Sequence, residues 1–234
     1  MNVTPPARPG TGEFVSQRRQ LLERIEDEVR ATARDLGRET LDPRVERALL
    51  DVPRHEFVAP GDETRAYLDA PLPIGHGQTI SQPFIVAVMT ELLATRPGDV
   101  VLEIGTGSGY QAAVLAGLVA RVYSIEIVAP LAARAAATLT RLGYDNVEVR
   151  VGDGHQGWPE HAPFDGIILT AAGGEIPPAL FAQLRSGGRL VAPVETEAGG
   201  QSLRVYRKSN SGQVTMKDVL PVMFVPLTGH DDDA

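Results

Sequence analysis

A glycine-rich turn next to an apolar segment is the feature that most constrains this chain. Residues 100–104, Val-Val-Leu-Glu-Ile, are mostly large and apolar, which predicts a strand buried on both faces of a sheet. Gly105, Gly107 and Gly109 follow at alternate positions, and an apolar pattern with helical spacing continues over residues 111–119. Glycine has no Cβ atom and tolerates positive φ, so the backbone of such a turn can approach a ligand closely. The helix that begins there directs its free N–H groups at the same ligand.

The spacing of the three glycines separates two classes of ligand. A dinucleotide site has the pattern Gly-x-Gly-x-x-Gly, in which the third glycine lets the helix pack on the strand. Here the third glycine comes one residue early, and Tyr110 occupies the position that the dinucleotide pattern requires for it. The sequence also lacks the Gly-Lys-Ser/Thr run of a triphosphate-binding loop. The pattern favours an adenosine ligand without phosphate groups, with a tight turn that binds no ligand as the alternative.

Strand and helix patterns alternate after the turn. Strands are predicted at residues 122–126, 147–151, 164–170 and 189–194, and helices at residues 130–142 and 177–184. Strict alternation is typical of a parallel sheet covered on both faces. Residues 203–207 and 214–225 predict an antiparallel hairpin. We therefore expect an α/β fold with a doubly wound, mostly parallel sheet, a C-terminal antiparallel hairpin and an N-terminal helical cover.

The residues before the sheet predict a tail, helices and a long loop. Residues 1–16 are expected to be a disordered tail, and residues 17–230 a single domain. Asp42 precedes a proline and predicts the start of a helix. Residues 54–77 form a loop that carries enough apolar side chains to be ordered. Ser81 suits the N-cap of the next helix, and a catalytic role is its alternative.

Composition excludes several kinds of site. The 234 residues include no cysteine, so we expect no disulfide, no thiolate zinc site and no cysteine nucleophile. The five histidines show no metal-ligand spacing, and we assign no metal. The net charge of −8 without a basic run argues against a nucleic-acid partner. Because the sequence has no signal peptide and no run of about 18 apolar residues, we expect a cytoplasmic protein without a membrane partner.

Two acidic positions follow strands at the edge of the sheet where the glycine turn lies. Ligands of doubly wound sheets bind at the carboxyl ends of the strands. Glu126 ends a predicted strand, where a carboxylate can accept hydrogen bonds from ribose hydroxyl groups; the alternative is a solvated acid. Asp153 and Gly154 follow the next strand and suit an adenine ring, and a turn stabilised by the Asp153 side chain is the alternative.

Two segments resemble methyltransferase motifs. The run Glu-Ile-Gly-Thr-Gly-Ser-Gly over residues 103–109 resembles motif I of the S-adenosylmethionine-dependent methyltransferases of the seven-stranded, Rossmann-like class. Residues 75–83, Gly-His-Gly-Gln-Thr-Ile-Ser-Gln-Pro, more specifically resemble the protein-L-isoaspartate(D-aspartate) O-methyltransferase family. Further similarities to this family lie at residues 52–58, 66–69, 152–154, 162–165, 184–190 and 225–228.

The resemblance implies an activity, a cofactor and a division of the domain. The family uses S-adenosylmethionine to methylate the α-carboxylate of L-isoaspartyl and D-aspartyl residues in damaged proteins and peptides, which starts repair through a succinimide and leaves S-adenosylhomocysteine. Residues 17–95 would then be a helical cover with a substrate loop, and residues 96–230 the cofactor-binding core of a monomer. The implied catalytic residue is Ser81. The implied cofactor contacts are Thr79, Ile80, Glu103, Gly105, Thr106, Gly107, Gly109, Glu126, Asp153, Gly154 and Thr228.

One departure from the family pattern leaves alternatives open. Met223 stands where many bacterial relatives carry an arginine that would contact the substrate. A second hypothesis is therefore a methyltransferase of the same fold that acts on a small molecule or on another protein group. A third is a cofactor-binding protein that has no substrate, which the glycine turn, Glu126 and Ser81 argue against.

Overall fold

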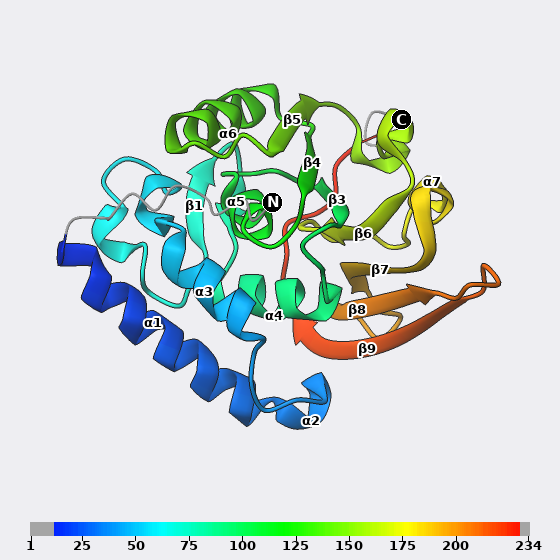
Figure 1. Ribbon diagram of the computed structural model, residues 1–234, viewed down its shortest axis with the longest axis horizontal. Coiled ribbons are helices and arrows are strands. Elements are labelled where there is room, and N and C mark those ends of the chain that lie inside the picture. Colours follow the sequence, from blue (N-terminus) through cyan, green and yellow to red (C-terminus); the bar gives the residue numbers. More distant parts are fainter. Residues whose placement is uncertain (1–11, 230–234) are drawn as a thin grey trace.

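A seven-stranded sheet forms the centre of the computed structural model, which describes residues 12–229 (Figure 1). Its strands lie in the order β5-β4-β3-β6-β7-β8-β9. Their bounds are β3 (Val100–Ile104), β4 (Arg121–Glu126), β5 (Val147–Val151), β6 (Phe164–Leu169), β7 (Leu184–Glu195), β8 (Gln201–Lys208) and β9 (Val214–Val222). The strands from β5 to β7 pair in parallel, and β8 and β9 add in antiparallel direction. The predicted sheet with its C-terminal hairpin is confirmed.

Helices cover both faces of the sheet. One face carries α4 (Pro83–Leu93), α5 (Tyr110–Ala116) and α6 (Ala129–Leu142), and the other carries α7 (Pro178–Gln183) with the short 3-10 helices η3 (Gly154–Gln156) and η4 (Pro159–His161). Side chains of consecutive strand residues point to opposite faces. Val101 accordingly joins the core under α4 and α5, whereas Leu102 and Ile104 join the core under α7. The central strand is mostly apolar because both of its faces are buried.

Three N-terminal helices form the predicted cover, which packs mainly on α4 and also contacts α5 and β9 (Figure 1). They are α1 (Gly12–Ala31), α2 (Ala33–Leu36) and α3 (Pro43–Asp51). Asp42 caps α3 as predicted, because its side chain accepts a hydrogen bond from the Arg44 amide. The predicted tail was too long, since α1 begins at Gly12 and residues 12–16 are helical; residues 1–11 lie outside the described residues. Among the helices of residues 12–229, none has both the length and the apolar character needed to cross a bilayer.

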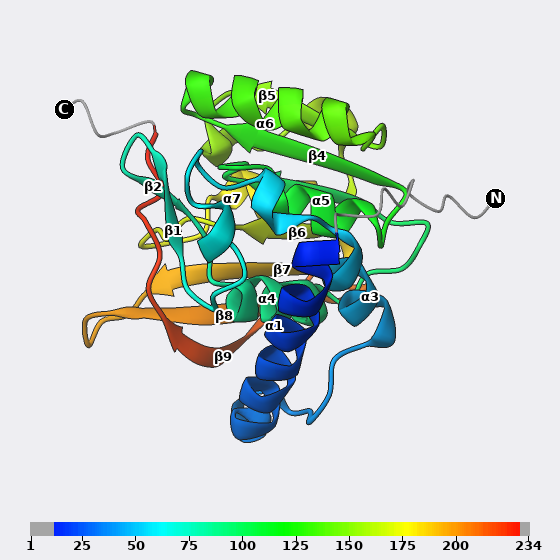
Figure 2. The same ribbon diagram turned by 90° about the vertical axis from the view of Figure 1, so that its left-hand side faces the viewer.

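The connection between α3 and α4 is ordered, as predicted. It contains the 3-10 helices η1 (Arg54–Glu56) and η2 (Glu63–Arg65) and a two-stranded antiparallel sheet of β1 (Leu72–Gly75) and β2 (Gln78–Ile80). Figure 2 shows β1 and β2 beside the C-terminal segment, drawn in red, at one edge of the large sheet. Residues that follow the carboxyl ends of β3, β4 and β6 lie at that edge and line one cleft together with these segments.

Candidate active site

A cleft opens at the carboxyl ends of β3, β4 and β6. Its walls come from residues 78–81, 104–108, 125–128 and 225–228, together with Gly154, Thr170 and their neighbours. The structure thereby brings together most of the predicted site residues: Thr79, Ile80, Ser81, Gly105, Thr106, Gly107, Glu126, Gly154 and Thr228. Three predicted residues, Glu103, Gly109 and Asp153, are not part of the lining.

Two glycines of the turn are required by close packing. Gly105 has a φ of 93°, and a Cβ atom there would lie 2.5 Å from the Oγ1 atom of Thr170. Gly109 has a φ of 88°, and its Cβ would lie 3.3 Å from Ala135 and from Leu139 on α6. A side chain at Gly105 or Gly109 would push against these neighbours. The positive φ of both residues also disfavours any residue other than glycine. Gly109 therefore shapes the turn from behind the cleft.

Gly107 is the glycine that leaves room for a ligand. Its φ is 54°, and a Cβ atom there would approach one described atom within 4 Å, Cδ1 of Ile74 at 3.5 Å. The Gly107 amide donates a hydrogen bond to Oε2 of Glu126 at 2.7 Å, and the Val128 amide donates to Oε1 at 3.0 Å. The predicted ribose-binding carboxylate thus holds the turn in place. Each of its oxygens can accept a further bond from a ligand.

Asp153 and Gly154 lie between the cleft and the C-terminal segment. Asp153 caps η3, because Oδ1 accepts a hydrogen bond from the His155 amide at 2.9 Å. A Cβ atom at Gly154 would lie 2.3 Å from Cγ2 of Ile104, and one at Gly229 would lie 2.6 Å from Oδ1 of Asp153. The Gly154 backbone therefore forms part of the cleft floor, while Asp153 stabilises the turn beside it. A contact between Asp153 and adenine stays a prediction.

Glu103 is fully buried behind the turn. Its carboxyl group is hydrogen bonded to the hydroxyl group of Ser124, whose oxygen lies 2.6 Å from Oγ1 of Thr106. Burial raises the pKa of Glu103 to about 8, although the bond with Ser124 opposes the shift. Glu103 therefore carries a proton at neutral pH and reaches the cleft only through Ser124 and Thr106. The structure therefore places Glu103 behind the turn, outside the cleft lining that the sequence predicted it to join.

A second hollow of about 470 Å³ adjoins the cleft at Ser81. Ser81, Thr79 and Thr170 line both spaces, and so does Val225. The hydroxyl group of Ser81 has no hydrogen bond to any residue of the described range. Ser81 is thus available to a ligand on the wall that separates the two spaces.

The N-cap prediction for Ser81 was wrong. Gln82 occupies the N-cap of α4, and its side chain makes no capping bond. Asp69, which sequence reasoning missed, instead accepts hydrogen bonds from the Phe84 amide and from Nε2 of Gln82, both at 2.8 Å. Because Asp69 accepts the hydrogen bond of a free amide in the first turn of α4, the Ser81 side chain is not needed to cap the helix.

Arg54 is a second residue that sequence reasoning missed. Its guanidinium group is fully buried and donates to the carbonyl oxygens of Ala66 at 2.9 Å and Ser81 at 2.8 Å. It also lies over the Tyr110 ring, 4.8 Å from the ring centroid. Burial lowers the pKa of Arg54, and the nearby Tyr110 opposes that shift. Arg54 fixes the backbone of Ser81 relative to the start of α5.

Comparisons with known proteins identify the family. The family model described as protein-L-isoaspartate(D-aspartate) O-methyltransferase matches residues 29–232. Protein-L-isoaspartate O-methyltransferase 2 of Syntrophobacter fumaroxidans is 55% identical over 216 residues, which cover 92% of this chain and 87% of that protein. This chain belongs to the protein-L-isoaspartate(D-aspartate) O-methyltransferase family. A family member from a Polaromonas species is 54% identical over 210 residues, 90% of this chain and 100% of that protein.

Solved structures of protein-L-isoaspartate O-methyltransferases share the fold. One has a TM-score of 0.78 at 27% identity and covers 91% of this chain and 66% of its own. Another, from Plasmodium falciparum and in complex with S-adenosyl-L-homocysteine, has a TM-score of 0.74 at 25% identity and covers 90% of this chain and 98% of its own. The Rossmann-like methyltransferase fold expected from the sequence is therefore confirmed.

Two features of the site bear on the chemistry of this family member. Met223, the departure from the family pattern, lines the second hollow and is 94% exposed. No arginine or lysine lines that hollow within residues 12–229. In the same range, no three acidic or histidine side chains gather into a group that would hold a metal ion.

Proposed function

We propose that this protein transfers the methyl group of S-adenosylmethionine to the α-carboxylate of L-isoaspartyl and D-aspartyl residues in damaged proteins. Membership of the family supports this activity. The observation that carries it is the wall of Ser81, Thr79 and Thr170, which borders both the cleft and the second hollow. A carboxylate bound in the hollow would therefore lie next to a ligand bound in the cleft, because the two spaces share these residues.

The residues of the cleft fit the proposed cofactor. The open space beside Gly107 would take its methionine part, because the protein leaves that space unfilled. Glu126 would hold the ribose hydroxyl groups, since its oxygens retain acceptor capacity. The Gly154 backbone and Ile127, a 39% exposed apolar side chain in the cleft, would contact adenine. Bound there, the cofactor supplies a methyl group activated by its sulfonium centre.

The remaining contacts are proposed from the lining and the family pattern. Thr79, Ile80 and Thr228 line the cleft on the sides formed by β2 and the C-terminal segment. Thr106 connects the turn to Ser124 and through it to the protonated Glu103. Gly105 and Gly109 keep the turn in its close-packed conformation. These groups set the shape of the cleft and need no metal ion to do so.

The reaction requires positioning rather than a strong base. An unperturbed carboxylate has a pKa of about 4 and is already ionised at neutral pH. The protein must hold its oxygen in line with the transferred methyl group, and such alignment supplies much of the acceleration in reactions of this kind. The Ser81 hydroxyl group would donate a hydrogen bond to that carboxylate, and Arg54, which donates to the Ser81 carbonyl oxygen, supports the position of this residue. The resulting ester then closes to a succinimide with loss of methanol.

A pair of peptides tests the proposal. Methyl transfer from labelled S-adenosylmethionine should be measured on a peptide with one isoaspartyl residue and on its twin with ordinary aspartate. We expect label in the isoaspartyl peptide alone. Equal label in both peptides, or label in neither, would contradict the proposal. The Gly107→Val variant serves as the control for transfer that does not depend on the cleft.

The uncharged second hollow favours one other function. Because Met223 brings no positive charge, binding of the substrate carboxylate there depends on neutral donors such as Ser81, Thr79 and Gln82. A methyltransferase of this fold that acts on a small molecule or another protein group would suit such a hollow. Retained binding of S-adenosylhomocysteine without label in the isoaspartyl peptide would favour this second function.

A further inference from the structure

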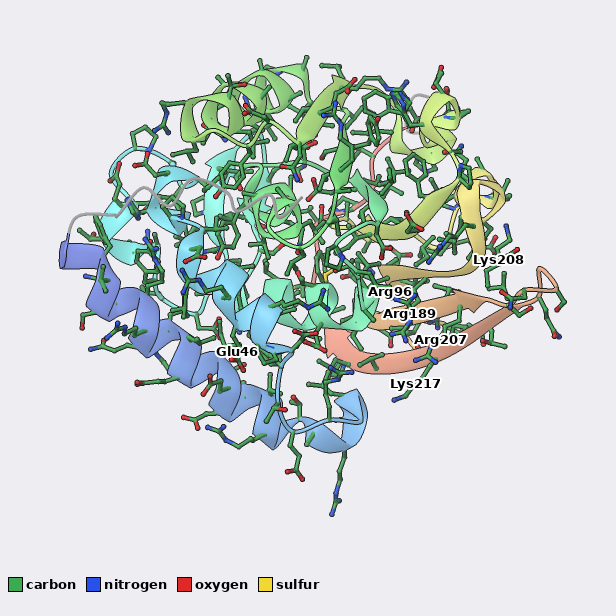
Figure 3. All side chains as sticks on the ribbon, viewed as in Figure 1. Glu46, Arg96, Arg189, Arg207, Lys208 and Lys217 are labelled. Carbon is green, nitrogen blue, oxygen red and sulfur yellow. The ribbon has the colours of Figure 1, made fainter. Side chains whose placement is uncertain are left out.

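A pocket of about 330 Å³ lies on the α4 face of the sheet, over β7, β8 and β9. Three cationic side chains line it, Arg189, Arg207 and Lys217, and we call it the basic pocket. Figure 3 shows these side chains next to one another across this part of the sheet. The rest of its wall is largely apolar and includes Leu36, Leu92, Val205, Met216 and Val219. Its volume falls within the range of sites for small molecules, which begins at about 300 Å³.

The cations of the basic pocket form no ion pair with the residues that the structure describes. Arg189 and Arg207 lie directly opposite each other in the antiparallel pairing of β7 and β8. Like charges in this arrangement destabilise a sheet. Within residues 12–229, no salt bridge involves Arg189, Arg207 or Lys217. This concentration of charge stands out in a chain whose net charge is −8.

Two of the three cations are fixed by backbone carbonyl groups. Nη1 of Arg189 donates to the carbonyl oxygen of Leu92 in the last turn of α4 at 3.0 Å, and Nζ of Lys217 donates to that of Asp35 in α2 at 2.9 Å. Burial, followed by the charges of Arg207 and Arg38, lowers the pKa of Arg189. Arg207 is exposed and forms no hydrogen bond through its side chain within the described residues. A ligand that binds Arg207 therefore displaces no protein partner.

The basic pocket is separate from the site described above. Arg189 pairs with Gly166 in the first half of β6, whereas the cleft lies beyond the carboxyl end of that strand at Thr170. Among residues 12–229, none lines both the basic pocket and either the cleft or the second hollow. The methyl-transfer chemistry gives no reason for a cluster of cations there.

We infer that the basic pocket is a second ligand site, which takes a small organic dianion of the phosphate monoester class. Arg189 and Arg207 would pair with the phosphate oxygens, because guanidinium groups bind phosphate through parallel hydrogen bonds. Thr215, directly opposite Arg207 on β9, adds a hydroxyl donor. The apolar part of the ligand would lie on Val205 and Leu36. Because cationic and apolar side chains line the same pocket, an organic phosphate fits it better than free inorganic phosphate.

Titration calorimetry with phenyl phosphate tests this inference. The whole protein is first saturated with S-adenosylhomocysteine in a phosphate-free buffer of low ionic strength, so that the cofactor cleft is not available to the probe. We expect one saturable site, with phenyl phosphate binding more tightly than inorganic phosphate because of the apolar wall. We also expect phenyl phosphate to bind more tightly than benzoate, which carries a single charge. Absence of a saturable site, or displacement of S-adenosylhomocysteine by the probe, overturns the inference.

A matched pair of variants locates the site. Arg207→Gln should weaken phenyl phosphate binding by at least about 10-fold, because it removes charge-assisted hydrogen bonds. Arg19→Gln removes the same charge from an exposed position on α1 and should change the affinity by less than about 2-fold. Equal losses in both variants would mean that the probe responds to net charge alone, and the basic pocket would then not be its site. Unchanged circular dichroism in both variants excludes unfolding as the cause.

Discussion

The carboxylate of Asp69 accepts a hydrogen bond from the backbone amide of Phe84 at 2.8 Å, across 15 residues of sequence. The bond ties the connection before β1 to the first turn of α4, which begins two residues after Ser81. A second bond, from Nε2 of Gln82, strengthens the same link. The position of the proposed active-site serine therefore depends on a residue outside its own segment.

Replacement of Asp69 should destabilise the protein through the start of α4. We expect Asp69→Ala to lower the free energy of unfolding by about 1–2 kcal/mol, since the helix loses its acceptor. Asp69→Asn keeps one oxygen acceptor and should cost less. Urea unfolding of the two variants measures the difference. If Asp69→Ala is as stable as the wild type, the carboxylate is not what holds α4.

A side chain at Gly107 should weaken cofactor binding without unfolding the protein. Gly107→Val projects into the cleft, so we expect the affinity for S-adenosylhomocysteine to fall by at least about 10-fold. Gly61→Val is the matched control, because Gly61 also has positive φ and open space around it but lies outside the cleft. Calorimetry gives both affinities. Equal affinities in the two variants would place the cofactor elsewhere.

Removal of the Ser81 hydroxyl group should slow the chemical step and spare cofactor binding. For Ser81→Ala we expect kcat on the isoaspartyl peptide to fall by about 10-fold to 100-fold, since alignment of the carboxylate is lost. The affinity for S-adenosylhomocysteine should stay within about 2-fold, because the cleft keeps its other walls. Ser186→Ala, at an exposed position, controls for the loss of any serine. An unchanged kcat would leave Ser81 with a packing role alone.

Glu103 should make the folded protein less stable as the pH rises. Its pKa of 4.5 in the unfolded chain rises to about 8 in the folded protein because of burial. The contribution of protonated Glu103 to the free energy of unfolding is complete below pH 4.5 and is lost progressively up to about pH 8. At pH 7 this loss is on the order of 3 kcal/mol, since one pKa unit corresponds to about 1.4 kcal/mol.

The Glu103→Gln variant tests this pH dependence. It cannot ionise, so its free energy of unfolding should fall less between pH 4.5 and 8 than that of the wild type. Some slope should remain, because burial and Asp69 raise the pKa of Glu28 to about 7 and Glu28 titrates in the same interval. Urea unfolding at several pH values gives both slopes. Parallel slopes in variant and wild type would show that Glu103 does not hold its proton in the folded protein.

Local patterns were sufficient to predict most of the sheet, because apolar strands alternate with helices and glycines separate them. The strand predicted at residues 147–151 is β5, and the one at 164–170 differs from β6 by one residue. β9 ends at Val222 rather than at residue 225, and the largest difference is at β7, which begins at Leu184 rather than at residue 189. Two glycines in that stretch favour a turn, but pairing with β6 extends the strand through a register shift between Phe164 and Gly166.

The site was predictable where its residues follow a strand and not where distant segments meet. Glu126 ends β4, so the edge of the sheet fixes its place. Glu103 is one residue from the end of β3, yet the alternation of side chains turns it into the core. Asp69 and Arg54 lie in a loop whose sequence shows no periodicity. Only the tertiary fold reveals that they hold α4 and Ser81.

The wall formed by residues 225–228 has a consequence for biosynthesis. The Ala172 amide donates a hydrogen bond to the carbonyl oxygen of Val225, and the Ala172 carbonyl oxygen accepts one from the Leu227 amide. These bonds can form only after β9, the last strand of the sheet, has been synthesised. A nascent chain therefore contains the glycine turn before it contains the wall that completes the cleft. We therefore expect tight binding of the cofactor only after residue 228 has been synthesised, because one wall of the cleft is missing until then.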